Sequence, residues 1–351
     1  MRIGDLPPEI HDYIANYVSL AGTSSQSPHP CETADLHYTR PSILALESTS
    51  RYWSSICKPY KFNFLPIVLV PAKGNGENTV LFDLVERLKN LAPHERRVRH
   101  LQLREPAVFT NEVSTLDFTS TIPRLLDLLA PTLHSLVLSF PYSRYSTSLF
   151  AFTYSVPFPQ LRHLSINGFY PPPRLPPSIT TTADNEGQMV LGQPNFPVLR
   201  TLRLQGVRNP TGLLCSHRFQ LIFPVLRKLV IGGLADASGF ANEVAHVLST
   251  HDDFTSRIGD MSHLSSYEDV YSLLSRENPN LGIPVTLSEF VVNARQNTPK
   301  SHVVPLKRPS KYHASRHEKM LDTFKSLEHR LGKGNALNRV ELKVINGKFD
   351  A

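Results

Sequence analysis

Phe158-Pro-Gln-Leu-Arg-His-Leu-Ser-Ile166 is one of three closely similar stretches in this sequence. The pattern returns as Phe196-Pro-Val-Leu-Arg-Thr-Leu-Arg-Leu204 and as Phe223-Pro-Val-Leu-Arg-Lys-Leu-Val-Ile231. In each stretch the last apolar residues alternate with polar ones, which is typical of a short strand with one buried face. Self-similarity along a chain indicates one structural unit repeated.

Four weaker copies fit the same pattern, L-x-x-L-x-L with apolar substitutions. They are Val98-Arg-His-Leu-Gln-Leu103, Leu133-His-Ser-Leu-Val-Leu138, Leu287-Ser-Glu-Phe-Val-Val292 and Leu337-Asn-Arg-Val-Glu-Leu342. This pattern is the leucine-rich-repeat signature, with one strand per repeat. One strand cannot bury its apolar face alone, so we expect stacked parallel strands backed by helices.

Helical spacing between the strands supports this fold. Val80, Leu84, Leu88 and Leu91 form one apolar stripe, and similar spacing occurs in 122–129, 240–248 and 320–327. The repeats are irregular. The long gaps before Leu287 and Leu337 contain either a degenerate unit or long insertions. Three units carry Gly and an apolar residue where the family has Asn, so the turn there must be stabilised differently: Gly168-Phe169, Gly206-Val207 and Gly233-Leu234. A different α/β fold is the alternative.

The amino-terminal segment has the pattern of a small helical module. Apolar residues recur every four positions from Leu6 through Ile10 and Ile14 to Val18, after a proline-rich start that suits the first turn of a helix. Further apolar stretches lie at 43–46 and 53–57. Between them, residues 21–41 read as a solvated inserted loop.

These residues resemble the F-box. The family motif opens with Leu-Pro-x-Glu-[Ile/Leu], here Leu6-Pro7-Pro8-Glu9-Ile10, and closes with an Arg-x-Trp element, here Arg51-Tyr52-Trp53. The insertion at 21–41 and Thr49-Ser50 before the arginine depart from the pattern. The chain thus resembles a fungal-type F-box protein with a leucine-rich-repeat-like carboxyl-terminal domain. The resemblance implies docking onto the adaptor subunit of an SCF-type (cullin–RING) ubiquitin ligase. The alternative is a helical cap for the repeats.

We therefore predict an α/β protein. Residues 1–60 form an F-box-like module, and residues 61–351 form an irregular leucine-rich-repeat solenoid. The resemblance implies that Leu6, Pro7, Ile10, Ile14 and Trp53 contact the adaptor, which connects the chain to a cullin scaffold. The predicted role is a non-catalytic substrate receptor, with a ligase-independent interaction scaffold as the alternative.

Composition limits the partners and the compartment. The net charge of +7, from 37 basic and 30 acidic residues, favours acidic partners but is too diffuse to indicate nucleic acid. Cys31, Cys57 and Cys215 form no CxxC pair, which fits a reducing compartment. The amino terminus has no apolar signal core, and the apolar run 62–70 is too short to span a bilayer. We expect a cytoplasmic or nuclear protein without membrane contact.

No catalytic motif stands out. Gly74-Asn75-Gly76 follows the strand-like segment 67–70 but lacks the third glycine of a dinucleotide fingerprint, so a plain turn is favoured. His29, Cys31 and His37 lack a clear fourth metal ligand. We predict no catalytic residue, no metal and no cofactor. Bound metal or nucleotide in purified protein would revive the alternative of an enzyme.

The outward positions of the strands predict a binding face. On the concave side of the solenoid we expect His100, Arg104, His163, Arg203, Lys228 and Arg339 to face a target protein. Because basic residues outnumber acidic ones there, the predicted target is an acidic or phosphorylated segment. The alternative is a solvated face whose charges only maintain solubility. Basic residues also occur in the loop 294–315, and the loop 170–195 reads as exposed.

Overall fold

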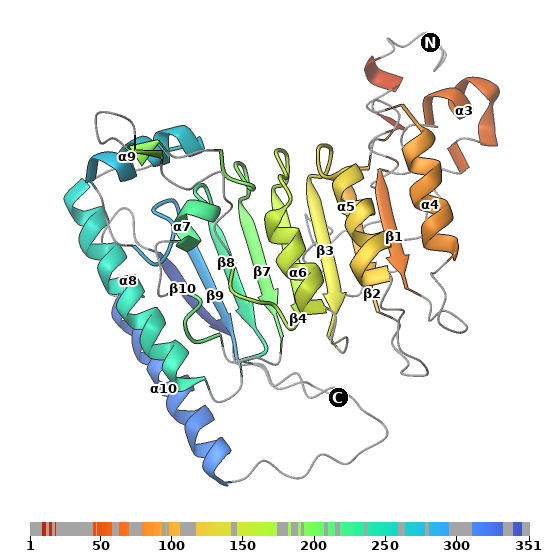
Figure 1. The fold of residues 1–351 in the computed structure, drawn as a ribbon. Helices are drawn as coiled ribbons and strands as arrows, with labels where there is room; N and C mark the ends of the chain where they lie inside the picture. Colours follow the sequence, from red (N-terminus) through yellow and green to blue (C-terminus); the bar gives the residue numbers. More distant parts are fainter. Residues whose placement is uncertain are drawn as a thin grey trace. The chain divides into compact units, whose positions relative to one another are not determined.

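The computed structural model of the chain is an α/β fold with one sheet of eight parallel strands (Figure 1). The structure describes residues 9–11, 14–15, 18, 45–46, 48–57, 63–69, 79–92, 96, 98–105, 117–141, 146–173, 182–183, 189–190, 193–206, 210–214, 218–234, 237–258, 264–277, 281–294, 311–332 and 340–345. The residues that lie outside these ranges include the Gly74 turn, the whole inserted loop 21–41 with its histidines and cysteine, most of 174–192 and all of 295–310.

The strands follow the order β1-β2-β3-β4-β7-β8-β9-β10 in the sheet. Their bounds are β1 (Phe64–Val68), β2 (His100–Arg104), β3 (Ser135–Phe140), β4 (His163–Gly168), β7 (Thr201–Gln205), β8 (Lys228–Gly232), β9 (Glu289–Asn293) and β10 (Glu341–Ile345). Seven of them are the strands that the repeats predict. A separate antiparallel pair, β5 (Thr182–Ala183) and β6 (Met189–Val190), lies within the predicted loop 170–195.

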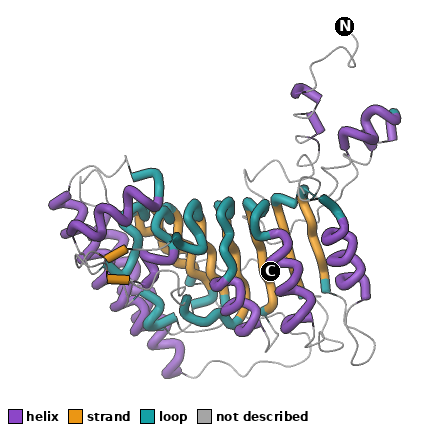
Figure 2. Tube along the Cα trace, turned by 45° about the horizontal axis from the view of Figure 1, so that its top comes forward, coloured by secondary structure: helices purple, strands orange, loops and turns teal. Residues whose placement is uncertain are grey.

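Helices connect the strands and lie beside them (Figure 2). Their bounds are α3 (Arg51–Cys57), α4 (Thr79–Asn90), a π-helical turn (Asp117–Thr121), α5 (Ile122–Leu129), α6 (Ser146–Ser155), α7 (Arg218–Ile222), α8 (Ser238–Ile258), α9 (Tyr267–Glu277) and α10 (Lys311–Gly332). The chain divides into two compact units, Met1–Ser139 and Phe140–Ala351. We call them unit 1 and unit 2 and describe each by itself.

Unit 1 contains an eighth repeat-like strand that the sequence pattern missed. Phe64 and Leu65 are buried, and β1 pairs in parallel with β2 so that Leu65 lies beside Leu101. Pro66 interrupts the apolar alternation and lacks a backbone donor, which a strand tolerates at the edge of a sheet, where β1 lies.

The predicted apolar stripe of α4 is also corrected. Val80 is 77% exposed, and the buried positions are Leu81, Val85 and Leu88. These three follow the i, i+4, i+7 spacing of one helix face, so the helix is rotated by about one residue from the predicted stripe.

The long gaps between the last strands are insertions, not missed units. β8 pairs directly with β9, and β9 with β10. The first gap holds α8 and α9, and the second holds α10. Phe240 of α8 packs against Phe324 of α10, so the inserted helices bury apolar surface of their own.

The last repeat is shifted from its predicted register by two residues. Leu342 pairs with Phe290, and Val344 pairs with Val292, whereas the pattern placed Leu342 beside Val292. A shift of two keeps every side chain on its predicted face, because side chains alternate along a strand. The backbone N–H of Val344 is bound by the Glu328 carboxylate of α10 at 3.0 Å, which satisfies a donor of this edge strand.

Unit 2 is stacked through the three phenylalanines of the repeat. Phe158, Phe196 and Phe223 are fully buried. The rings of Phe158 and Phe196 stack with centroids 5.6 Å apart, and those of Phe196 and Phe223 are 5.3 Å apart. Each large ring therefore packs on the ring of the adjacent repeat, which sets the spacing of the loops that precede the strands.

Glycines lie at the carboxyl ends of these strands, where the leucine-rich-repeat pattern has Asn. A Cβ on Gly168 would collide with the carbonyl oxygen of Phe140, one on Gly206 with that of Gly168, and one on Gly233 with that of Gly206. The backbones of consecutive repeats approach one another here more closely than any side chain permits. Gly233 also has φ of +76°, which favours glycine.

We predict that Gly206→Ala lowers the free energy of unfolding by about 1–3 kcal/mol, because the added methyl group overlaps a backbone carbonyl. Chemical denaturation measures the change. Gly239→Ala is the matched control, since its Cβ would meet only the flexible side chain of Thr211. Equal stability of both variants would contradict the close approach.

A second prediction concerns His251, which is fully buried on α8. Burial lowers its pKa from 6.5 to about 4, and the nearby carbonyls of Val285 and Pro284 offset this only in part. Because the unfolded chain binds the proton first, stability is retained above pH 6.5 and falls by about 3 kcal/mol as the pH drops toward 4. The free energy of unfolding of His251→Leu should change much less between pH 6.5 and pH 4 than that of the unmodified chain. His246→Leu, on an exposed position of the same helix, should behave like the unmodified chain.

Candidate functional site

Unit 2 presents one sheet face on which polar side chains align in rows. The first row contains His163, Thr201, Lys228, Glu289 and Glu341, one from each strand. The second row contains Ser165, Arg203, Val230, Val291 and Lys343. We call this surface the polar face. The alternate residues, such as Leu164, Leu202 and Leu229, are fully or almost fully buried. The repeat pattern therefore predicted correctly which side chains share each face.

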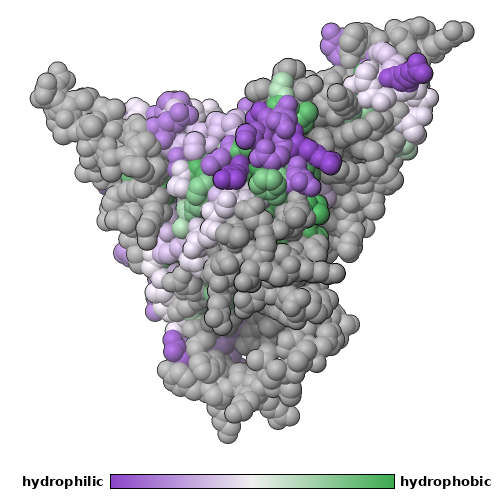
Figure 3. Space-filling view, turned by 45° about the vertical axis from the view of Figure 1, so that its right-hand side comes forward, coloured by the Kyte–Doolittle hydropathy of each residue, from purple (hydrophilic) through white to green (hydrophobic). Residues whose placement is uncertain are grey.

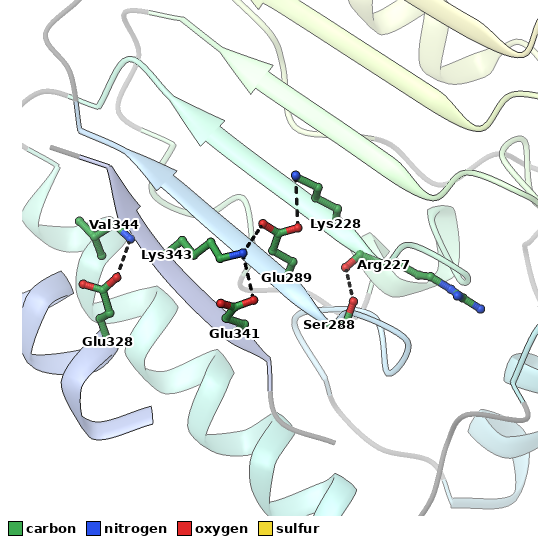
Figure 4. Close-up of polar contacts among 8 residues, drawn as sticks. All are labelled: Arg227, Lys228, Ser288, Glu289, Glu328, Glu341, Lys343 and Val344. Atoms are coloured by element: carbon green, nitrogen blue, oxygen red, sulfur yellow. Dashed lines mark hydrogen bonds and ion pairs between the residues drawn. The ribbon is translucent and has the colours of Figure 1, made fainter. Parts of the chain in front are cut away.

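Glu289 is the centre of the polar face on β8, β9 and β10. Its carboxylate lies 3.2 Å from Nζ of Lys228 and 3.0 Å from Nζ of Lys343. Lys343 also lies 3.0 Å from the carboxylate of Glu341. Figure 4 shows Lys343 between the two glutamates and Lys228 on the other side of Glu289.

The register explains why these charges gather. Glu289 and Glu341 are direct neighbours on adjacent strands, and two like charges in this position destabilise a sheet. Lys343 lies two residues further along β10 and reaches back between them. The Glu289 side chain is only 23% exposed, so its charge requires the two lysines as partners.

The electrostatics of the cluster follow from this geometry. Burial alone would raise the pKa of Glu289, but hydrogen bonds and charge from Lys343 and Lys228 outweigh it and hold the pKa below the ordinary 4.5. Hydrogen bonds to Glu289 and Glu341 raise the pKa of Lys343. Both shifts favour the charged forms of Glu289 and Lys343 near neutral pH.

The predicted target-binding residues fall into two groups. His163, Arg203 and Lys228 lie on the polar face of unit 2, on three consecutive strands. His100 and Arg104 lie at the two ends of β2 in unit 1. There the His100 ring lies beside Phe64, and the Arg104 guanidinium donates to the Gln102 amide oxygen. Arg339 lies outside the described residues.

The acidic target was predicted because basic residues outnumber acidic ones at the outward positions of the strands. Ion pairs make the resulting excess of positive charge smaller than a count of residues suggests. In the two rows of the polar face, Lys228 and Lys343 are paired with Glu289 and Glu341, so the charges of these lysines do not add to a basic excess.

Arginines that the sequence analysis did not select lie next to the polar face. Arg162, Arg200 and Arg227 directly precede β4, β7 and β8, and all three are exposed. The backbone N–H of Arg200 donates to the carbonyl of Arg162, and that of Arg227 to the carbonyl of Arg200, each at 2.9 Å. The signal was present, because arginine occupies the same position in all three copies of the repeat.

The predicted adaptor-contacting residues separate into buried and exposed ones. Trp53 is 8% exposed and packs with Ala15 and Cys57, against which Ile14 also packs. Ile10 is 43% exposed. Leu6 and Pro7 lie outside the described residues. Ile14 and Trp53 thus contribute to the core of the small helical module, while Ile10 presents an apolar side chain to solvent.

His11 connects the two helical pieces of this module. It is almost fully buried, its Nδ1 lies 2.5 Å from the hydroxyl of Tyr52, and its ring meets the Trp53 ring edge-on at 5.4 Å. Tyr52 is 48% exposed. Ile10 is next to His11 in sequence, and Tyr52 contacts it. Within the described residues of the module, these two are the large apolar or aromatic side chains that are exposed.

Other apolar side chains are exposed singly, among them Val80, Val198 and Phe169. In the view of Figure 3, hydrophobic residues of the described surface lie beside strongly hydrophilic ones. Among the described residues, no group of three or more His, Cys, Asp or Glu side chains is placed to hold a metal ion. No helix in the described part of the chain is long and apolar enough to cross a membrane.

We predict that Glu289→Gln lowers the free energy of unfolding by less than about 1 kcal/mol at neutral pH and low salt, because it leaves two lysines without their partner at a partly exposed site. The depressed pKa means that the carboxylate stabilises the fold above pH 4.5 and loses this effect as the pH falls through its folded value. The difference between the variant and the unmodified chain should shrink in acid and in high salt. Glu341→Gln, at a position whose side chain is 63% exposed, should cost less.

Comparisons of the chain with models of protein families, with curated proteins and with solved structures found no match.

Proposed function

We propose that this chain is a non-catalytic substrate receptor of an SCF-type ubiquitin ligase, with the amino-terminal module binding the adaptor and the repeats holding a target protein. The proposal rests first on the F-box-like motif of residues 6–10 and 51–53. It rests also on a sheet of repeated strands that would form the irregular leucine-rich-repeat solenoid.

The observation that carries the proposal is the division of the module into a core and two exposed apolar side chains. Trp53, Ala15 and Cys57 hold its helices together, while Ile10 and Tyr52 remain 43% and 48% exposed beside His11. The exposed side of Ile10 adds nothing to the module's own stability, and Tyr52, which contacts His11, still presents about half of its surface to solvent. A protein interface gains from both, because apolar and aromatic anchors supply much of the binding energy.

The role of such a receptor is positional. Bringing a target lysine close to a charged ubiquitin carrier raises its effective concentration. This chain would supply no reacting group, and the cullin scaffold would contact it only through the adaptor.

We predict that co-expression with the ligase adaptor yields a one-to-one complex, and that Ile10→Asp weakens it roughly tenfold or more because it places a charge in an apolar interface. A pull-down with titrated adaptor measures the loss. Val198→Asp is the matched control, since Val198 is 37% exposed on unit 2, and it should leave the complex intact.

Circular dichroism must show that both variants are folded. A folded chain that forms no complex with the adaptor would contradict the proposal and favour a ligase-independent leucine-rich-repeat scaffold. Equal loss in both variants would contradict the assignment of Ile10 to the interface.

A further inference from the structure

The loops that precede β4, β7 and β8 carry a row of three exposed arginines. We call Arg162, Arg200 and Arg227 the arginine row. Their backbones are hydrogen-bonded from one to the next, so the side chains start from positions one strand spacing apart, or about 4.8 Å. Figure 4 shows the Arg227 side chain directed away from the cluster of Lys228 and Glu289.

Within the described part of the chain, no carboxylate forms an ion pair with this row. Residues 156–162, 193–200, 223–227 and 281–288, which form the loops leading into these strands and β9, contain no Asp or Glu. The ion pairs of the described residues do not include any of the three guanidinium groups. Three like charges in adjacent loops, unpaired within the described residues, repel one another, and a bound anion would offset this repulsion.

The backbone role of this position does not require arginine. The carbonyl of Arg200 accepts the N–H groups of both Arg227 and Lys228, and the carbonyl of Ser288 accepts that of Glu341 in the same way. In unit 1 the carbonyl of Asn63 binds two N–H groups of the next repeat. Because serine and asparagine serve equally well, the fold gives no reason for three arginines in succession.

We propose that the arginine row binds a carboxylate-rich extended segment of a partner protein. A guanidinium grips one carboxylate with two parallel hydrogen bonds. Three single positive charges spread over about 10 Å, two strand spacings, match three separate carboxylates better than one concentrated dianion. Val198, 37% exposed in the loop that leads to Arg200, supplies an apolar contact between them.

The surroundings of the row favour a protein segment over a nucleic acid. A polyanion that binds nonspecifically needs a continuous basic track. On the adjacent polar face, Lys228 and Lys343 are paired with Glu289 and Glu341, so these lysines do not extend the arginine row into such a track.

This inference depends on the proposed function only in identifying the bound segment as the target. Its test requires no adaptor. The full-length chain is titrated against a fluorescein-labelled peptide in which glutamate alternates with serine, and binding is followed by fluorescence anisotropy at low salt. The variant changes all three arginines of the row to glutamine. The control changes Arg124, Arg257 and Arg276, which are exposed on three different helices, so the loss of net charge is the same.

The row variant should bind the peptide about 100-fold more weakly, because each of the three exposed ion pairs contributes about fivefold. The control variant should stay within about twofold of the unmodified chain, because long-range charge is screened.

Equal weakening in both variants would overturn the proposal, as would equal binding of a glutamine–serine peptide or no binding by folded protein. Tighter row-dependent binding of a single-stranded homopolymer would overturn the commitment to a protein partner. Binding of only a phosphoserine peptide would overturn the commitment to carboxylates. Failure here with an intact adaptor complex would leave the ligase role standing.

Discussion

The approach of one backbone to the next at the carboxyl ends of the strands is the constraint on which unit 2 depends. Gly168, Gly206 and Gly233 each lie against a carbonyl oxygen of the preceding repeat, with no space for a Cβ. The phenylalanine stack sets the spacing at the opposite ends of the strands. With both ends fixed, the strands between them have little freedom except to pair in parallel and in register, and the rows of the polar face follow.

Hydrophobic alternation was sufficient to predict most of the sheet. It located β2, β3, β4, β7, β8, β9 and β10 and assigned their buried and outward positions, because burying Leu164 or Leu202 forces the residues beside it outward. It failed for β1, since Pro66 breaks the alternation and is tolerated only because β1 is an edge strand. It also could not distinguish registers that differ by two residues. Leu342 is buried in either register, and the observed one is stabilised by polar contacts, from Glu328 to Val344 and from Lys343 to the two glutamates.

The candidate site was less predictable for a related reason. Lys228 was correctly placed on the outward face, but a count of outward charges takes no account of pairing with Glu289. Pairing depends on which residues become neighbours across strands, and it changes an apparently basic face into a nearly balanced one. Likewise, burial of Trp53 in the module core depends on contacts with Ala15 and His11 from a distant part of the sequence, which no local motif specifies.

The same reasoning separates residues that fold the protein from residues that are free to act on a partner. An arginine whose carbonyl anchors the next repeat contributes through its backbone alone, and Ser288 performs this task with a hydroxymethyl side chain. Lys228, one residue further along β8, is instead held by Glu289. Adjacent positions in one repeat thus differ in the role of their charges. The charge of Lys228 is paired within the sheet, whereas that of the preceding arginine, Arg227, faces solvent. The part of the net charge of +7 that can act on a partner therefore depends on which of these side chains the fold leaves without a counter-charge.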